Sequence, residues 1–267
     1  MINAAVLGAC GRMGSLIIEN ITCSTDMQLV AAFDIGNIGK DAGGEFAHVG
    51  NLGIQISDVK DLETVLKKTQ ADVLIDFTAA GATIVNAPIA AGCGVNLIIG
   101  TTGITSEQRA VIEEAIRKNQ VRAVISPPNY SVGVNVFFKI VREAAKYLAD
   151  YDIEIIEAHH NQKKDAPPSG TALRAADVIS EALGGKEYVY GREGIAPPRG
   201  KEIGIHAVRG GDITGDHTVL FVGNSERVEI HHMAHSRQIF AKGAVRAAEW
   251  ICGQEPGIYS MDDVLGL

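Results

Sequence analysis

The sequence lacks most of the features that mark disulfide-stapled, membrane-spanning or metal-binding proteins. Its four cysteines, Cys10, Cys23, Cys93 and Cys252, form no CxxC pair, so neither a disulfide framework nor a zinc site is expected. No apolar run reaches the roughly 18 residues of a membrane span, and the first residues carry no basic region of a secretory signal. We therefore expect a cytoplasmic protein with no bound metal.

Positive charge is also scarce. The 267 residues include 24 Lys and Arg against 32 Asp and Glu, which gives a net charge of −8. A nucleic-acid partner is not expected, because such surfaces are basic, and an anionic ligand would need a local positive patch. Glycine, by contrast, is abundant at 30 residues, which indicates tight turns and close approach of the backbone to a ligand.

Short apolar runs alternate with longer amphipathic stretches over the first 126 residues. Strands buried on both faces are predicted at Ala4–Leu7, Leu29–Phe33, Val73–Phe77, Leu97–Ile99 and Ala123–Ile125. Helices are predicted between them at Met13–Cys23, Asp58–Thr69, Gly81–Ala91 and Ser106–Asn119. This alternation predicts a parallel sheet with right-handed crossovers.

The pattern changes after Pro127 and Pro128. Helices are predicted at Val134–Leu148, Thr171–Leu183 and Gln238–Cys252, and strands at Ile153–Glu157, Glu202–Val208, Thr218–Val222 and Arg227–His232. The last three strands follow one another without helices, which favours an antiparallel or mixed sheet. We expect an α/β fold in two domains: a Rossmann-like parallel-sheet domain of residues 1–129 plus 239–267, and an α+β domain of residues 130–238 with a mixed or antiparallel sheet.

A glycine-rich turn, Gly8–Gly14, follows the first predicted strand and opens the first helix with GxxGxxG spacing. Glycines there allow the backbone to approach a pyrophosphate at a helix N-terminus. Asp34 lies twenty residues beyond Gly14 at the end of the second strand, where a carboxylate can accept both ribose hydroxyls of an adenosine. The alternative is a tight structural turn and a solvated aspartate.

Asp34 also bears on the choice of dinucleotide. Its carboxylate would repel the 2′-phosphate of NADP, and the next residues are Ile35 and Gly36 rather than an arginine. Arg12 and Lys40 are the nearby cations that could offset this repulsion. We expect NADH to be preferred and NADPH to be tolerated.

Two further segments follow predicted parallel strands at the end where ligands bind in open α/β sheets. They are Gly100–Gly103 and Pro127–Tyr130. Each could instead be only a strand–helix turn.

Side chains that could bind an anion or transfer a proton are most concentrated between Glu157 and Thr171. Two histidines and two lysines fall within His159–Lys164, and Ser169 opens a helix. Lysine, histidine and free N–H groups at a helix start make an anion site with proton donors. The alternatives are a solvated basic loop and a metal site, the latter disfavoured because adjacent histidines point apart and no acid or cysteine lies at ligand spacing.

Several motifs of the sequence resemble those of a known protein family. EAHHNQKKDAPPSGTA resembles the signature of dihydrodipicolinate reductases, and GACGRMG, DFT, GTTG, NYSVGVN and VRGGDITGDH resemble further family blocks in the same order. The resemblance implies NAD(P)H-dependent reduction of 4-hydroxy-tetrahydrodipicolinate in lysine and diaminopimelate biosynthesis. It also implies a two-domain, hinged subunit that assembles as a homotetramer through the sheet of the second domain.

The resemblance further implies roles for individual residues. His159 would be the proton donor and acceptor and Lys163 a second proton donor, while His160, Gly170 and Thr171 would bind the dicarboxylate substrate. The residues that would line the dinucleotide are Gly8, Ala9, Cys10, Gly11, Arg12, Met13, Asp34, Gly100, Thr101, Thr102, Pro127, Pro128, Asn129 and Tyr130. The sequence departs from the family in an extra proline before Ser169 and in the missing arginine after Asp34.

Two other functions fit parts of the sequence. One is another two-domain NAD oxidoreductase, such as an aspartate or sugar dehydrogenase, although these enzymes lack the HH-x-x-K…SGT block. The other is a non-catalytic sensor that binds NADH without turnover, because fold and ligand binding alone do not imply catalysis.

Overall fold

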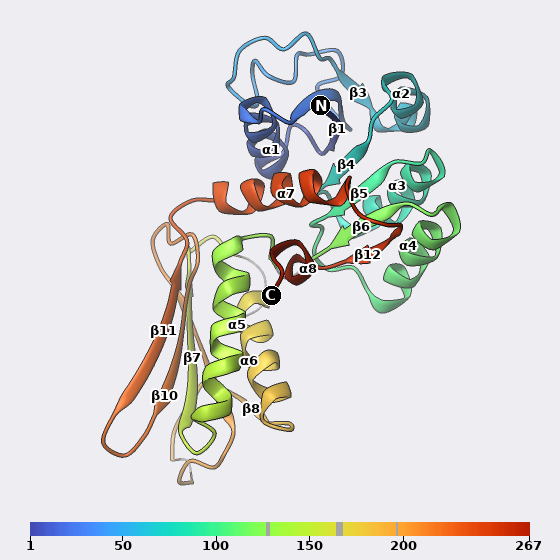
Figure 1. Cartoon of the computed structure of the whole chain (residues 1–267). Helices are drawn as coiled ribbons and strands as arrows, with labels where there is room; N and C mark the ends of the chain where they lie inside the picture. The colour runs from blue at the N-terminus through green and yellow to red at the C-terminus, as the bar shows by residue number, and fades with distance from the viewer. Residues whose placement is uncertain (127–128, 164–167, 196) are drawn as a thin grey trace. The chain divides into compact units, whose positions relative to one another are not determined.

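The computed structural model describes residues 1–126, 129–163, 168–195 and 197–267. Its contacts divide the chain into two compact units (Figure 1). The first unit comprises Met1–Ser131 and Gln238–Gly266, and the second comprises Val132–Arg237.

The first unit contains a seven-stranded sheet in the order β12-β6-β5-β4-β1-β2-β3, and every neighbouring pair is parallel. Its strands are β1 (Ile2–Leu7), β2 (Met27–Asp34), β3 (Ile56–Asp58), β4 (Val73–Asp76), β5 (Asn96–Ile99), β6 (Arg122–Ile125) and β12 (Gly257–Tyr259). The chain leaves β1 toward β2 on one side and continues from β4 on the other. The strand order therefore reverses at β1, which is where ligands bind in such sheets.

Helices cover both faces of this sheet because its strands carry apolar side chains on both faces. They are α1 (Arg12–Cys23), α2 (Leu62–Thr69), α3 (Ala80–Gly92), α4 (Ser106–Asn119), α7 (Gln238–Ile251) and α8 (Met261–Leu265). Alternate side chains point to opposite faces, so Val6 packs in one apolar cluster with α1, α7 and α8, whereas Leu7 packs in another with α2, α3 and α4.

The second unit contains a five-stranded mixed sheet in the order β11-β10-β7-β9-β8. Its strands are β7 (Asp152–His159), β8 (Tyr188–Tyr190), β9 (Ile203–Arg209), β10 (Asp216–Val222) and β11 (Arg227–Met233). The central strand, β7, is antiparallel to β10 and parallel to β9. The helices α5 (Val132–Tyr147) and α6 (Gly170–Ala182) cover one face, so Ile155 is buried while its neighbour Ile156 is 39% exposed on the other face.

These two sheets confirm the predicted fold class, with differences in the start of one helix and in three short strands. The predicted helix Asp58–Thr69 begins only at Leu62, because Asp58 ends β3 and its carboxylate accepts a hydrogen bond from the Lys60 N–H at the start of a 3₁₀ turn. The short strands β3, β8 and β12 were not predicted, because three residues carry no readable periodicity. Among the described residues, no helix is both long and apolar enough to cross a membrane.

A glycine in α7 provides a test of this packing. A Cβ on Gly243 would lie 1.7 Å from the Tyr130 carbonyl oxygen, a backbone atom that cannot move aside. Gly243→Ala should therefore destabilise the protein by about 1–3 kcal/mol, the usual cost of overpacking. Gly81→Ala in α3, where nothing lies within 4 Å, should instead be neutral or stabilising. Chemical denaturation of both variants measures the contrast, and equal stabilities would contradict it.

Candidate functional site

The turn after β1 is shaped by glycines. Gly8 has a φ of +77°, a conformation that favours glycine, and a Cβ on Gly14 would lie 2.1 Å from the Gly8 carbonyl oxygen. The first turn of α1 has no side-chain cap, since its N-cap residue is Gly11. The turn therefore offers backbone N–H groups and the positive end of a helix dipole, which suit an anion.

Asp34 lies beside this turn. Its Oδ2 accepts a hydrogen bond from the Cys10 N–H at 2.9 Å, and its Oδ1 accepts one from the Ile35 N–H at 2.7 Å. Burial and the nearby Asp34 carboxylate raise the pKa of the Cys10 thiol to about 11, so this cysteine stays neutral. The side chain of Ile35 is 91% exposed. Asp34 is thus bonded to the glycine turn and stands next to open solvent.

A buried carboxylate, Asp76, holds the neighbouring turns together. Its Oδ1 accepts hydrogen bonds from the Thr78 N–H and hydroxyl at 2.9 and 2.6 Å and from the Thr101 hydroxyl at 3.4 Å. Burial raises the pKa of Asp76 despite these bonds. Gly100 packs so closely on Phe77 that an added Cβ would lie 2.2 Å from the ring. Thr101 is therefore buried in this network, whereas Thr102 is exposed.

The segment after β6 is only partly described, because Pro127 and Pro128 lie outside the described residues. The Asn129 carbonyl oxygen accepts a hydrogen bond from the Ser126 hydroxyl at 3.1 Å. Tyr130 is buried, and its hydroxyl lies 2.9 Å from the Ile99 carbonyl oxygen and 2.8 Å from that of Val124. Its side chain thus braces β5 and β6 from within.

These segments lie together because five parallel strands end at one edge of the sheet. Leu7 pairs with Phe33 and Asp76, and Asp76 pairs with Ile99, so the strand ends are level. Three features of this edge together fit a dinucleotide. They are glycines at contacts that a Cβ would obstruct, a helix start without a side-chain cap, and a carboxylate at the end of the second strand. The roles of the individual residues stay predictions.

The second unit has its own buried carboxylate, Glu157 on β7. Its Oε2 lies 2.6 Å from His159 Nδ1 and accepts a hydrogen bond from Arg209 Nη1 at 2.8 Å. Its Oε1 accepts hydrogen bonds from Arg209 Nη2 at 2.9 Å and from the Ser169 N–H at 3.1 Å. Burial would raise the pKa of Glu157, but the bonds from His159 and Arg209 hold it at about 2. Glu157 is therefore ionised at neutral pH.

His159 lies at the end of β7, and its ring packs edge-on against His217 at 5.3 Å between centroids. Burial, with the nearby His159, lowers the pKa of His217 to about 3, so His217 is neutral. Its Nε2 lies 3.1 Å from the Ser169 hydroxyl, and Ser169 also caps α6 by accepting a bond from the Ala172 N–H. The Ser169 hydroxyl is thus used within the protein.

The remaining predicted site residues come after the end of β7 in the chain. The Lys163 N–H donates to the His160 carbonyl oxygen at 3.1 Å, and His160 Nε2 lies 3.4 Å from Arg237 Nη2. Gly170 is exposed in the first turn of α6, whereas Thr171 beside it is buried. The predicted catalytic and substrate-binding residues thus lie on one loop and the helix start that follows it.

Sequence reasoning missed three members of this cluster: Glu157 and Arg209 around His159, and His217 beside it. Glu157 could have been found, because residues two apart on a strand share a face. Arg209 and His217 stand in the segment VRGGDITGDH, but nothing local shows that β9 and β10 flank β7.

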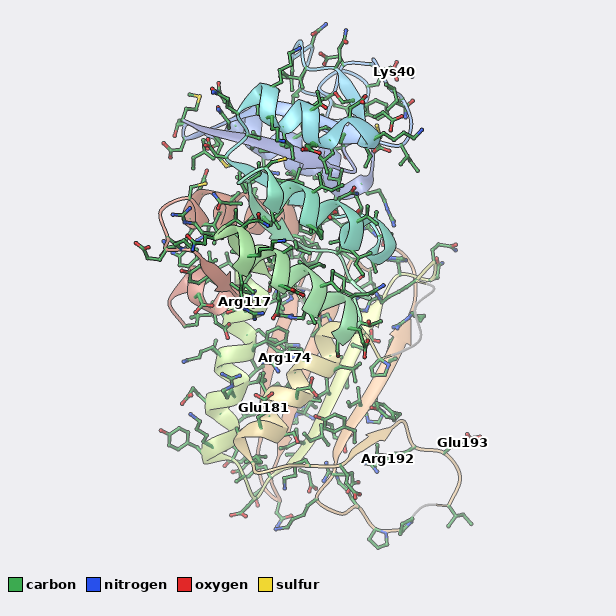
Figure 2. The ribbon with its side chains drawn as sticks, turned by 90° about the vertical axis from the view of Figure 1, so that its right-hand side faces the viewer. Lys40, Arg117, Arg174, Glu181, Arg192 and Glu193 are labelled. Atoms are coloured by element: carbon green, nitrogen blue, oxygen red, sulfur yellow. The ribbon has the colours of Figure 1, made fainter. Side chains whose placement is uncertain are left out.

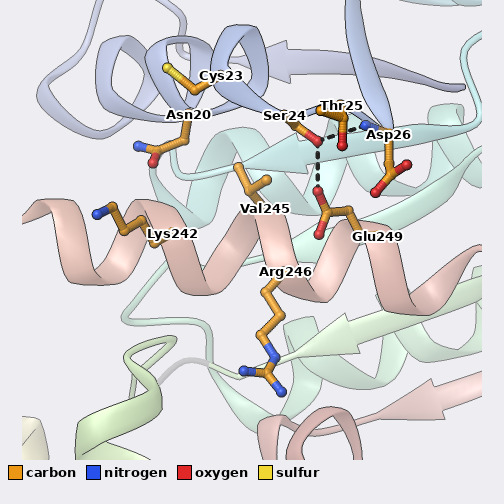
Figure 3. A pocket seen from close by; sticks show the side chains of 9 residues that line it. All are labelled: Asn20, Cys23, Ser24, Thr25, Asp26, Lys242, Val245, Arg246 and Glu249. Carbon is orange, nitrogen blue, oxygen red and sulfur yellow. Dashed lines mark hydrogen bonds between the residues drawn. The ribbon is translucent and has the colours of Figure 1, made fainter.

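Two further features of the described residues do not add to this site. A groove of about 390 Å³ between α1 and α7 is lined by charged groups of both signs, including Asp26, Lys242, Arg246 and Glu249 (Figure 3). It lies at the C-terminal end of α1, whereas the glycine turn lies at the N-terminal end. Among the described residues, no group of three or more His, Cys, Asp or Glu side chains could hold a metal ion.

Comparison with known proteins accounts for the whole chain. Residues 2–130 match the family described as "Dihydrodipicolinate reductase, N-terminus" and residues 133–265 match "Dihydrodipicolinate reductase, C-terminus". The chain is 98% identical, over all of both chains, to 4-hydroxy-tetrahydrodipicolinate reductase from Methanosarcina mazei. It is 54% identical, over all of this chain and 98% of the relative, to the protein of the same name from Methanocaldococcus jannaschii.

A solved structure gives the same result. The dipicolinate-bound dihydrodipicolinate reductase from Paenisporosarcina sp. TG-14 is similar with a TM-score of 0.78 and 27% identity, over 97% of both chains. These findings confirm the resemblance and the reductase function predicted from the sequence. The chain belongs to the dihydrodipicolinate reductase family.

Proposed function

We propose that this NAD(P)H-dependent reductase acts on 4-hydroxy-tetrahydrodipicolinate through the His159 cluster of the second unit, with the dinucleotide held by the first. The observation that carries the proposal is the hydrogen-bonded Glu157–His159 couple beside Lys163 and the start of α6. It places a positioned histidine on one loop with Lys163 and the positive end of the α6 dipole. The names of the 98% identical relative and of the dipicolinate-bound neighbour support the substrate class.

Binding a dicarboxylate requires positive charge in a chain whose net charge is −8. Lys163 supplies it locally, next to His160, and the first turn of α6, at Gly170 and Thr171, offers the positive end of a helix dipole. A Cβ on Gly170 would meet nothing within 4 Å, so the helix start is open to a ligand.

Reduction of the ring also requires a proton. The bound reduced nicotinamide supplies a hydride, and a proton must reach the electron-rich atom that results. His159 is suited to deliver it, because Nδ1 is engaged by Glu157 and the opposite ring nitrogen is left for the ligand side. Lys163 neutralises the substrate and serves as the second donor.

Alanine substitution tests these roles. His159→Ala and Lys163→Ala should each lower kcat by about 10²–10⁴, the usual size of a general-acid term, because each removes a proton donor. NADH affinity should change little, since neither residue belongs to the first unit. The measurements are steady-state rates and NADH titrations.

Lys146→Ala, on the exposed side of α5, is the matched control and should leave kcat unchanged. Near-normal turnover of both site variants would favour a solvated basic loop. NADH binding without turnover by the unmodified protein would favour the sensor.

For the cofactor, we propose that NADH is preferred over NADPH. A 2′-phosphate beside Asp34 would bring like charges together, which costs about 4 kcal/mol per pair at 4 Å and an effective dielectric of 20. Relaxation, solvent and the exposed Arg12 should leave roughly 1–2 kcal/mol, or about tenfold. Lys40, labelled in Figure 2, pairs with Glu45 at 2.7 Å, so using it to offset the phosphate would cost that ion pair.

Ile35→Arg tests this preference. The exposed position next to Asp34 would gain a guanidinium that can pair with a phosphate, so kcat/KM and affinity for NADPH should rise while those for NADH change little. Ile35→Gln, neutral and of similar length, is the control and should not gain NADPH use. The proposal fails if the unmodified enzyme already prefers NADPH.

We also propose that four copies assemble through the uncovered face of the second sheet. Ile156, Val208 and Met233 are 39%, 47% and 59% exposed. The strand register puts all three on the face opposite α5 and α6. Val208 and Asp216 both pair with Ala158, which lies two residues from Ile156 and therefore on the same face. Met233 pairs with Asp216 and so lies on that face as well. Exposed apolar groups on a sheet face favour burial against another copy.

Introducing charge on this face should break the assembly. The double variant Ile156→Asp with Val208→Asp should lower the mass measured by light scattering from that of a tetramer, because burying two unpaired carboxylates is unfavourable. Val85→Asp, at a 57% exposed position on α3, should leave the mass unchanged. A monomeric unmodified protein at micromolar concentration would overturn the proposal.

A further inference from the structure

Glu157 is bonded to groups from well beyond its own strand. Four donors from three separate segments reach its two oxygens: His159 on β7, Arg209 twice from β9, and the Ser169 backbone before α6. Its side chain is fully buried. We propose that Glu157 is a positioning residue that sets the tautomer of His159, and that Arg209 is a counter-charge that limits how tightly His159 holds its proton. This inference rests on the proposed role of His159 as proton donor.

The tautomer follows from the hydrogen bond. Ionised Glu157 is only an acceptor, and its Oε2 lies 2.6 Å from His159 Nδ1. Nδ1 must therefore carry a hydrogen in every protonation state that keeps this bond. The proton that His159 can give or take is then the one on Nε2.

The opposite side of the ring agrees with this assignment. A Cβ on Gly215 would lie 3.1 Å from His159 Nε2 and 3.4 Å from its Cδ2. A side chain at position 215 would thus crowd the working nitrogen, and glycine leaves it clear. The His159 ring is held at Nδ1, and glycine at position 215 leaves room beside Nε2.

Arg209 adjusts the charge that His159 meets. A lone buried carboxylate at 2.6 Å would hold an imidazolium so strongly that it would be a poor acid. Arg209 pairs with both oxygens of Glu157, at 2.8 and 2.9 Å, and shares its negative charge. The pair keeps the orientation of His159 while weakening the attraction for its proton.

Other titratable groups lie near His159 on the surrounding segments. His217 on β10 is neutral near physiological pH, since burial lowers its pKa to about 3. Lys163 acts on this cluster as a positive charge, as its effect on His217 shows. His232 on β11 is one strand beyond His217, and burial lowers its pKa. None of these groups changes in the variants below, so shifts between variants report on Glu157 and Arg209.

The two charges predict opposite effects, which damage to the fold would not produce. Glu157→Gln removes the negative charge and should move the pH at which His159 is half protonated down by about one unit or more. Arg209→Met removes the positive charge and should move it up. Arg209→Lys restores the charge and should return it toward that of the unmodified protein.

The primary readout is the pH titration of the ¹³Cε1 resonance of His159 in the full-length free protein, assigned with His159→Asn. It needs no turnover, so it tests the inference even if the proposed reaction is wrong. The alkaline fall of kcat should move in the same directions. Glu181→Gln, an exposed acid on α6 paired with Arg174 (Figure 2), is the control and should shift neither.

The outcomes distinguish the positioning role of Glu157 from the role of His159 as proton donor. Opposite shifts in the resonance support the positioning role, and matching shifts in kcat support His159 as the donor as well. Shifts of the same sign in Glu157→Gln and Arg209→Met, or no shift in either, would overturn the inference. Shifts in the resonance without any change in the kcat profile would leave Glu157 and Arg209 as described but assign the proton to another group, Lys163 first.

Discussion

A carboxylate with no exposure to solvent, Glu157, lies near the end of the central strand of the second sheet. Removing such a charge from water is costly unless hydrogen bonds and counter-charges replace the water. The chain meets this requirement with Arg209 from β9, the Ser169 N–H before α6, and His159 two residues along β7. The start of α6 and the direction of the His159 ring are therefore both tied to one side chain. Loss of Arg209 would remove the cation that compensates this buried charge.

The first unit contains a second buried carboxylate, Asp76, whose pKa is shifted in the opposite direction. Asp76 has hydroxyl and backbone donors but no cation among its described partners, and burial raises its pKa. Glu157 has an arginine and a histidine, and its pKa is held at about 2. The pKa values of two acids at strand ends are thus shifted in opposite directions, because only one of them receives cationic donors. Asp76 braces the turns around a glycine-lined edge, whereas Glu157 contributes a permanent negative charge to a proton-transfer cluster.

The two sheets differ in how many of their faces are covered by helices. The strands of the first sheet carry apolar side chains on both faces, and helices cover both: α1, α7 and α8 on one side, and α2, α3 and α4 on the other. Strands that alternate need only one covered face, which α5 and α6 provide. The uncovered face of the second sheet retains exposed Ile156 and Val208, while its covered face ends in the polar layer of Glu157, His159 and His217.

Patterns within single segments determined much of this protein. The parallel sheet, the mixed sheet, the glycine turn before α1 and the polar segment after β7 could all be predicted, because periodicity, turn chemistry and helix starts are local properties. The family followed from motifs of the same kind. The short strands β3, β8 and β12 could not be predicted, since three residues gain their form from the strand beside them.

Only the tertiary structure decided which side chains meet. Arg209 lies 52 residues from Glu157, and His217 lies 48 residues from Ser169, yet both pairs are within hydrogen-bond distance. These contacts exist because β9 and β10 flank β7, an order that the sequence does not display. The charge states of Glu157 and His217 depend on burial and on these partners, so they too arise from the folded structure. The sequence by itself determined which reactive groups are present, and the pairing of strands determined which of them are ionised and which way they face.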